Sequence, residues 1–184
     1  MSTSWSAITT RSDGYTITAA ADWNVVAGSV NHLGQADRCV MVTDTANTSV
    51  NTATWQQLTW ATEEYDTGLF HSTTTNTSRM TVPTGFGGVY NVTASVTWTA
   101  SSGSALFLQV RKNGAASTAP SLVASMTNFG SLFANGDPVI QLNGQLRLVA
   151  GDYLELYTAQ NSGGALALKG TTQAHRFGLT WVAA

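Results

Sequence analysis

Apolar and polar side chains alternate without a break near the middle of the chain, between residues 89 and 98. One face of this stretch carries Tyr90, Val92, Ala94, Val96 and Trp98, and the other carries Asn91, Thr93, Ser95 and Thr97. A period of two built from β-branched and aromatic residues is typical of a half-buried strand. Just upstream, a proline at position 83 and glycines at positions 85, 87 and 88 predict a turn. We therefore expect a long central strand that the chain enters through this turn.

The same alternation returns in four later segments, at residues 105–112, 139–149, 153–158 and 174–182. Asn113-Gly114 follows the first of these segments and is a strong hairpin signal, and Gly151-Asp152 predicts the turn before the third. Shorter apolar runs precede the central strand, and no convincing helix lies among these segments. We therefore predict an all-β domain at residues 55–184, built as an antiparallel double-sheet sandwich.

The spacing changes to that of a helix near the N-terminus. Trp23, Val26, Val30 and Leu33 follow one another at steps of three, four and three, which places them on one apolar stripe. Thr18 fits an N-cap and Gly34 fits a stop just past the end, so a helix is expected at about residues 18–33. A helix this short needs a surface to lie against. It either docks on another molecule or packs on its own domain.

The segment between this helix and the β-domain shows little pattern. Residues 35–54 contain one short apolar run, at 40–42, and then a tract rich in threonine and asparagine. Such a tract predicts a linker or a loosely paired edge strand. The polar residues 61–68 predict a loop within the β-domain. The chain is thus divided into an N-terminal segment, 1–54, and a β-domain, 55–184.

The composition narrows the classes of function. Charged residues make up 10% of the 184-residue chain and the net charge is −2, which argues against a nucleic-acid partner because that needs a basic face. Surfaces of hydroxyl and amide groups suit packing against other subunits, where ions would be costly to desolvate. A single cysteine, Cys39, excludes an internal disulfide framework. The first residues show no signal peptide and no run of the sequence could span a bilayer, so we expect a protein made in a cytoplasm and not secreted.

Several motifs of the β-domain resemble, in their order and spacing, the globular heads of the complement first component and the tumour necrosis factor family. The motifs are Val82-Pro83 with Gly88-x-Tyr90, then Lys112-Asn113-Gly114, then Leu146-x-Leu148-x-x-Gly151-Asp152-x-Leu154-x-Leu156, and finally Phe177-Gly178 with Trp181. The turn after Pro83 is longer than in that family, and residues 115–138 match none of its motifs. The resemblance implies a jelly-roll sandwich and a homotrimer.

The N-terminal segment resembles a different group. Residues 16–34, followed by Glu64-Tyr65-Asp66 and a jelly roll, are similar to small structural proteins of tailed bacteriophages, especially those of actinobacteria. This resemblance implies a trimeric virion protein made in the host cytoplasm and displayed on the particle surface, on the tail or on the capsid. We expect Trp23, Val26, Val30 and Leu33 to anchor it to other virion proteins through residues 1–34. A host cell-surface glycan is a further candidate partner.

The sequence offers few groups for catalysis or metal binding. Glu63, Glu64 and Asp66 form the one carboxylate cluster, which fits either a hard cation such as calcium or, as we favour, a solvated turn. His32, His71 and His175 lack metal-ligand spacing, and no nucleophile or phosphate-loop motif is present. We therefore predict no cofactor, no metal and no enzymatic activity. A polysaccharide depolymerase with two distant carboxylates stays open as an alternative.

Aromatic residues give the strongest indication of binding surfaces. Tyr153 and Tyr157 oppose Leu154 and Leu156, and Phe107 likewise opposes leucines, so these strands are apolar on both faces. A strand of this kind needs two covers, and we expect Phe107, Tyr153 and Tyr157 to lie at the trimer interface. A loop from residues 115–138 could instead provide the second cover. In the alternative of a carbohydrate-binding module, Trp98 or Trp181 would stack on sugars.

Overall fold

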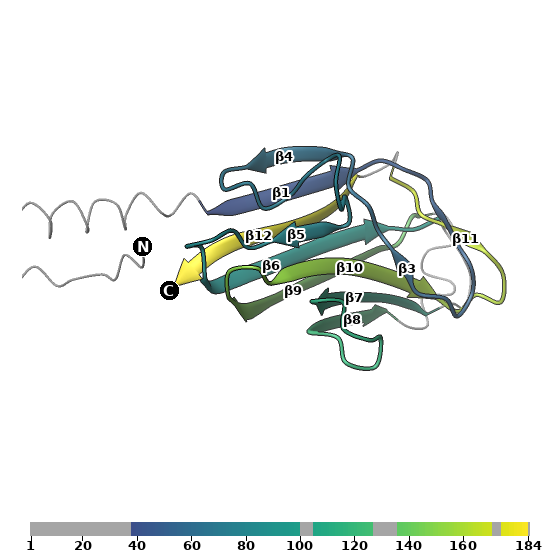
Figure 1. The fold of residues 1–184 in the computed structure, drawn as a ribbon. Coiled ribbons are helices and arrows are strands. Elements are labelled where there is room, and N and C mark those ends of the chain that lie inside the picture. Colours follow the sequence, from purple (N-terminus) through teal and green to yellow (C-terminus); the bar gives the residue numbers. More distant parts are fainter. Residues whose placement is uncertain (1–37, 100–104, 127–135, 171–173, 184) are drawn as a thin grey trace, which may run out of the picture.

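Two antiparallel sheets face each other, and their inward side chains form one core (Figure 1). The computed structural model describes residues 38–99, 105–126, 136–170 and 174–183. The first sheet has the order β4 (Thr62–Asp66), β1 (Cys39–Asp44), β12 (His175–Ala183), β6 (Gly88–Thr97), β9 (Val139–Leu148). The predicted antiparallel double-sheet sandwich is confirmed. The expected helix at about 18–33, with Trp23, Val26, Val30 and Leu33, lies outside the described residues.

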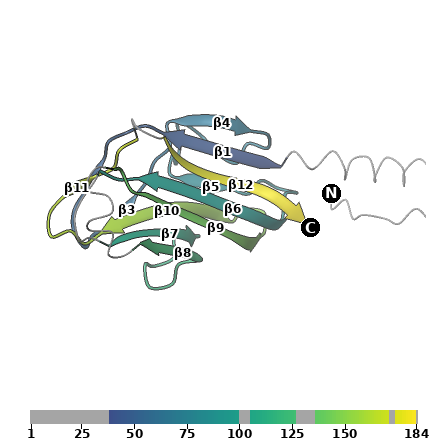
Figure 2. The same ribbon diagram turned by 180° about the vertical axis from the view of Figure 1, so that it is seen from behind.

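The second sheet is built around β10. Its order is β3 (Gln56–Gln57), β10 (Tyr153–Gln160), β7 (Leu106–Lys112), β8 (Leu122–Met126), and β5 (Arg79–Thr81) pairs with the first half of β10. β2 (Ser49–Val50) and β11 (Leu166–Ala167) form a separate short pair. Seen from behind, β6 and β9 again lie across from β10 and β7 (Figure 2). The fold is therefore two layers thick.

Strand β6 confirms the alternation predicted for the central strand. Tyr90, Val92 and Val96 are fully buried, whereas Asn91, Thr93 and Ser95 are only half-buried. β6 pairs along its length with β12 on one side and β9 on the other. Trp98, directly after the strand, has no exposed surface and packs in the core. The inward row of β6 is thus the middle of the hydrophobic core.

The turn before β6 is fixed by close backbone packing. A Cβ atom at position 88 would meet the carbonyl oxygen of Ala183 and the indole nitrogen of Trp181, so only glycine fits there. The Tyr90 hydroxyl donates a hydrogen bond to the Phe86 carbonyl. Burial raises the pKa of Tyr90 to about 12, which keeps the phenol protonated as a donor. Gly88 and Tyr90 of the recognised motif therefore serve to join the turn to the strand.

The predicted linker at 35–54 requires correction. β1 lies inside the sheet between β4 and β12, with Val40 and Val42 fully buried, and β2 pairs with β11. The sandwich therefore begins near residue 38 and not at residue 55. The predicted loop at 61–68 is also wrong, because β4 occupies most of it. β4 is an edge strand with mostly exposed side chains, and its polar sequence carries no alternation that could reveal it.

Asn113-Gly114 forms the expected turn but does not close a two-residue hairpin. Both residues have positive φ angles, 53° and 70°, yet the next strand, β8, begins only at Leu122. The Asn113 side-chain amide donates to Asp152 over 2.7 Å, and the Lys112 ammonium lies 2.6 Å from the same carboxylate. Burial alone would raise the pKa of Asp152, but these donors and the Val149 N–H outweigh it, and the pKa is lowered. The motif thus ties the end of β7 to the start of β10.

His175 is a buried histidine whose ring is satisfied in the neutral form. Its Nδ1 accepts a hydrogen bond from the Thr97 N–H at 3.2 Å, and its Nε2 donates to the Ala46 carbonyl at 3.3 Å. Burial lowers the pKa of His175 below 6.5, although the Ala46 carbonyl and Asp44 act in the opposite direction. Protonation at Nδ1 would place its N–H against the N–H of Thr97, so that two donors would face each other.

We predict that the free energy of unfolding decreases in acid because of His175. A lowered pKa in the folded state means that the stabilisation is complete above pH 6.5 and is lost as the pH falls from there through the folded pKa. Urea unfolding at pH 7.5 and pH 5 should show this loss in the natural protein and a smaller loss in His175→Gln. The variant His71→Gln controls for the other described histidine. An equal loss in the natural protein and in His175→Gln would contradict the assignment.

Candidate functional site

The residues predicted to mediate self-association lie together on the outer face of the second sheet. Tyr153 and Tyr157 project from β10, and Phe107 projects from the neighbouring strand β7, where it is opposite Ala159. All three side chains are half-buried. The structure therefore brings Phe107, Tyr153 and Tyr157 to one surface, as the alternation requires. The sequence predicts that these three residues lie at a trimer interface, and this surface competes for that role with the outer face of the first sheet.

Arginines of the same chain already cover the two tyrosines. The Arg79 guanidinium lies 4.2 Å from the centre of the Tyr153 ring, and that of Arg111 lies 3.7 Å from the centre of the Tyr157 ring. Such cation–π contacts stabilise both partners. Arg79 also pairs with Glu155 over 2.9 Å, and Glu155 is only 3% exposed. Part of the second cover that this face needs is thus built into the chain.

Arg111 differs from Arg79 because it has no carboxylate. Its side chain is 8% exposed, and its Nε donates to the Gln109 amide oxygen at 3.1 Å. Its Nη2 is buried and has no acceptor, and among the described carboxylates none pairs with it. Gln109 in turn donates to the Ser117 carbonyl, so residues of the segment 115–138 contribute to the cover. A buried guanidinium with an idle donor is costly and requires an explanation.

A small hollow opens between Trp55 and Phe107 on this face. It measures about 290 Å³ and is lined by Ala53, Trp55, Phe107, Ala159, Gln160 and Asn161. The rings of Trp55 and Phe107 lie 6.2 Å apart and are tilted by 56°. Trp55 also lies 5.2 Å from the Arg111 guanidinium, so its ring borders both the hollow and the cation.

The loop before Trp55 is held in an unusual backbone conformation. Ala53 has a φ angle of 55°, which costs energy for a residue with a side chain, and its N–H bonds the Gln160 carbonyl at 2.8 Å. This contact fixes the position of the loop against β10. No local pattern in the sequence shows that Trp55 and Arg111 meet in space, so neither residue could be predicted to have a role.

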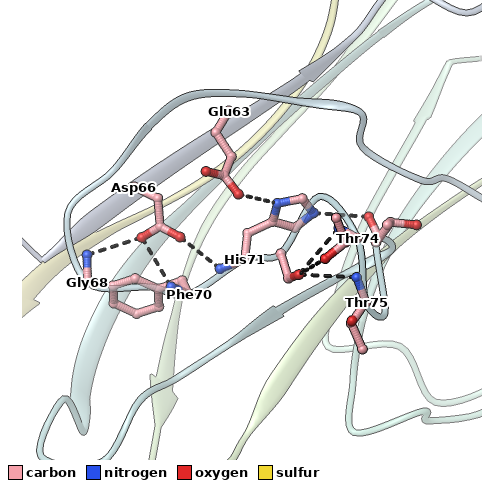
Figure 3. A network of polar contacts seen from close by, with 9 residues as sticks. Glu63, Asp66, Gly68, Phe70, His71, Thr74 and Thr75 are labelled. Atoms are coloured by element: carbon pink, nitrogen blue, oxygen red, sulfur yellow. Dashed lines mark hydrogen bonds and ion pairs between the residues drawn. The ribbon is translucent and has the colours of Figure 1, made fainter.

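The carboxylates that the sequence groups together do not converge (Figure 3). Asp66 accepts from the backbone N–H groups of Gly68, Phe70 and His71 at 2.8–3.1 Å. Glu63 contacts the His71 ring at 2.9 Å, and Glu64 pairs with Arg176 at 2.8 Å. No three acidic, histidine or cysteine side chains gather as a metal site would require in the described parts of the chain. Asp66 therefore shapes the turn after β4, whereas Glu63 and Glu64 lie within that strand and not in the solvated turn that we favoured.

The histidines are separated by the fold. The His71 side chain is fully buried between Glu63 and the Thr77 carbonyl, whereas His175 begins β12 and lies beside Thr97. His32 falls outside the described residues. The structure thus gives His71 and His175 different, internal partners.

Of the two tryptophans named for the alternative of a carbohydrate-binding module, Trp98 is not available to stack on a sugar. It has no exposed surface. Trp181 is half-buried, and the Arg38 guanidinium lies 5.4 Å from the centre of its ring. Core packing explains Trp98, because it continues the inward row of β6.

The outer face of the first sheet has a different character. A groove of about 420 Å³ lies across β1, β6, β9 and β12, lined by Met41, Thr93, Ala94, Ser95, Gln141, Leu142, Asn143 and Arg176. Hydroxyl, amide and apolar groups make up this lining except for Arg176, which Glu64 neutralises. The groove on the first sheet is therefore nearly uncharged, whereas the outer face of the second sheet contains buried charges.

Comparison with known proteins identifies the fold. The sequence matches no family model and no curated protein. Among solved structures, it is similar to the globular domain of zebrafish complement 1qA protein, at 17% identity over 80% of this chain and 99% of that chain, with a TM-score of 0.52. It is also similar to murine APRIL in crystals at pH 8.0 and pH 5.0, at 12% and 13% identity, with TM-scores of 0.55 and 0.53 and coverage of 78% of this chain and 98% of those chains.

These likenesses confirm the predicted jelly-roll fold. They do not bear on the resemblance to phage proteins, which stays a prediction. Within the described ranges, no helix is long and apolar enough to cross a membrane.

We predict that two of the clustered carboxylates, Asp66 and Glu64, differ sharply in their contribution to stability. Asp66→Ala should lower the free energy of unfolding by about 1–3 kcal/mol, because three backbone donors lose their acceptor. Glu64→Ala should change it by less than about 0.5 kcal/mol, because its ion pair is exposed. Urea denaturation measures both. Equal effects, or a melting temperature raised by added calcium, would show that the cluster acts as a cation site instead.

Proposed function

We propose that this chain is a non-enzymatic structural protein of a bacteriophage virion. It forms a homotrimer displayed on the particle surface, as a minor tail, tail-tip or fibre-head protein that contacts the host envelope. The resemblance of residues 16–34 and of Glu64-Tyr65-Asp66 to phage structural proteins supports this role, and the jelly-roll fold is compatible with it. A capsid decoration or head-spike protein of the same trimeric fold is the alternative placement.

The observation that carries the proposal is the nearly uncharged outer face of the first sheet. A protein surface that packs against a second copy must give up its water, and this costs most for ions. The groove across β1, β6, β9 and β12 contains a single charged side chain, Arg176, which already has a partner. Its hydroxyl and amide groups can exchange water for hydrogen bonds with a neighbouring subunit. This face is therefore our first choice for the contact between copies.

The face with Phe107, Tyr153 and Tyr157 is the second choice. It offers aromatic area, but Arg111 and the Arg79–Glu155 pair lie within it. Covering these groups with another subunit would complete their desolvation without supplying Arg111 with a carboxylate, unless the partner brought one. The two faces are distinguishable by placing one lysine on each.

A hydrolytic function is disfavoured by the state of the acidic groups. Glycoside hydrolysis needs one carboxylic acid that stays protonated in an apolar setting. Glu63, Asp66 and Glu155 instead face an imidazole, backbone N–H groups and a guanidinium. Each of these three carboxylates is thus already held by groups of the chain itself. We therefore propose a binding or structural role and not a depolymerase.

We predict that light scattering at micromolar concentration gives the mass of a trimer, and that Thr93→Lys lowers it to that of a monomer. Thr93 faces the groove of the first sheet, and a lysine there would bury a charge without a partner. Tyr157→Lys is the matched variant on the other face and should leave the trimer intact. A monomeric natural protein would overturn the proposal. Dissociation by Tyr157→Lys alone would move the interface to Phe107, Tyr153 and Tyr157.

We predict that residues 1–34 attach the protein to the particle. Deleting them leaves the first strand, which begins at Cys39, complete, so the melting temperature should hardly change. The shortened protein should remain a trimer and fail to enter virions. The double variant Trp23→Asp, Val30→Asp in the full chain should behave in the same way. Normal incorporation of that variant would place the anchor on the sandwich itself.

A further inference from the structure

We propose that the hollow between Trp55 and Phe107 binds an acidic sugar residue, whose carboxylate is received by Arg111. Neither the fold nor the proposed assembly assigns this site. The inference goes beyond the proposed function and does not depend on it, because sugar binding is measured on the isolated protein.

The state of Arg111 indicates the charge of the ligand. Arg111 is more than nine-tenths buried, pairs with none of the described carboxylates and has an N–H group with no acceptor, at Nη2. A guanidinium presents five donors and binds a carboxylate through a pair of them. Gln109 takes the Nε donor, and the faces of Tyr157 and Trp55 hold the plane of the group. A carboxylate from a ligand would complete this arrangement.

The shape of the hollow indicates the rest of the ligand. Ligand pockets usually measure about 300–1,000 Å³, with aromatic walls and few polar groups, so a hollow of about 290 Å³ suits a single ring. Trp55 and Phe107 are tilted by 56° and form a wedge, not a parallel slot. A wedge accommodates the puckered ring of a sugar better than a flat base. The apolar C–H groups of the sugar can pack on the two rings.

Polar groups at the rim suit sugar hydroxyls. Asn161 is exposed beside the hollow, and its side-chain oxygen already accepts from the Ala105 N–H at 2.6 Å. This bond fixes the amide with its NH₂ group free to donate. None of the residues that line the hollow carries a negative charge, and Glu155, which lies opposite Arg111 in the register of β10 and β7, is already paired with Arg79.

The geometry also predicts a movement on binding. Nη2 is enclosed, and the half-buried Trp55 ring lies at the border between it and the hollow. The ligand carboxylate reaches Nη2 when this ring turns aside. Binding should therefore change the fluorescence of Trp55, and the change should be missing in Trp55→Phe.

The test uses the full chain with two probes, methyl β-D-glucuronide and its neutral partner methyl β-D-glucoside. Titration followed by NMR chemical shifts and tryptophan fluorescence gives both affinities. We expect the glucuronide to bind at least about ten-fold more tightly, which is the effect of one charge-assisted hydrogen bond. Arg111→Gln should abolish the preference. Arg147→Gln, at an exposed arginine of the other sheet, should retain it.

Each other outcome counts against the site. Equal affinities for the two probes would remove the role of Arg111, and no binding of either probe would remove the site. Binding that persists in Trp55→Ala would place the sugar elsewhere. Should Trp55→Ala not fold, Trp55→Phe, which retains an aromatic ring, still has to weaken binding. Loss of the trimer in a folded Trp55 variant, without sugar binding in the natural protein, would show that a second copy occupies the hollow.

Discussion

The packing of β6 between β12 and β9 is the interaction on which the rest of the structure depends. Its inward row, from Tyr90 to Trp98, fills the centre of the core, and its register with both neighbours is continuous over most of the strand. A slip of one residue would turn the whole inward row to solvent. The same register therefore decides that Asn91, Thr93 and Ser95 face outward. A groove of hydroxyl and amide groups is the direct consequence of a well-determined core.

The second sheet solves a different problem. Its strands β10 and β7 are apolar on both faces, with leucines inward and aromatic residues outward, and the outer aromatics would be exposed without a cover. Arg79 and Arg111 provide part of that cover by lying flat on Tyr153 and Tyr157. Arg79 finds a carboxylate in Glu155, but Arg111 does not. The two cation–π contacts are otherwise similar, and the missing carboxylate makes the surroundings of Arg111 a candidate binding site. The two faces thus suit different roles, one self-association and the other recognition.

The sequence predicted the elements whose burial follows a regular period. β6, β9, β10 and β12 alternate clearly, and the motifs around Gly88, Asn113 and Asp152 occupy the turns expected for them. The sequence did not show that β1 belongs to the first sheet, because its partner β12 lies at the other end of the chain. β4 is polar on both sides as an exposed edge strand, and β8 is short and separated from its turn. The candidate binding site was even harder to predict from the sequence, because only the pairing of β3, β10 and β7 brings Trp55 and Arg111 together.

The carboxylates of β4 show again that distance along the sequence is a poor guide to which side chains act together. Glu63, Glu64 and Asp66 are neighbours in sequence, yet Glu63 contacts the His71 ring, Glu64 contacts Arg176 and Asp66 accepts from the backbone N–H groups of the turn that follows. Proximity in sequence therefore overstated their cooperation, whereas it missed that of Trp55 and Arg111. Side-chain direction along a strand, and not spacing alone, decides which groups can act together.

Hydroxyl-radical footprinting of the natural protein over a dilution series tests most directly whether the two faces have separate roles. Methionine and aromatic side chains react readily, and the molecule carries Met41 on the uncharged face and Trp55 at the hollow. We predict that oxidation of Met41 decreases as the protein assembles, while oxidation of Trp55 stays constant. Protection of Trp55 with Met41 unchanged would contradict it, because the contact between copies would then lie on the aromatic face.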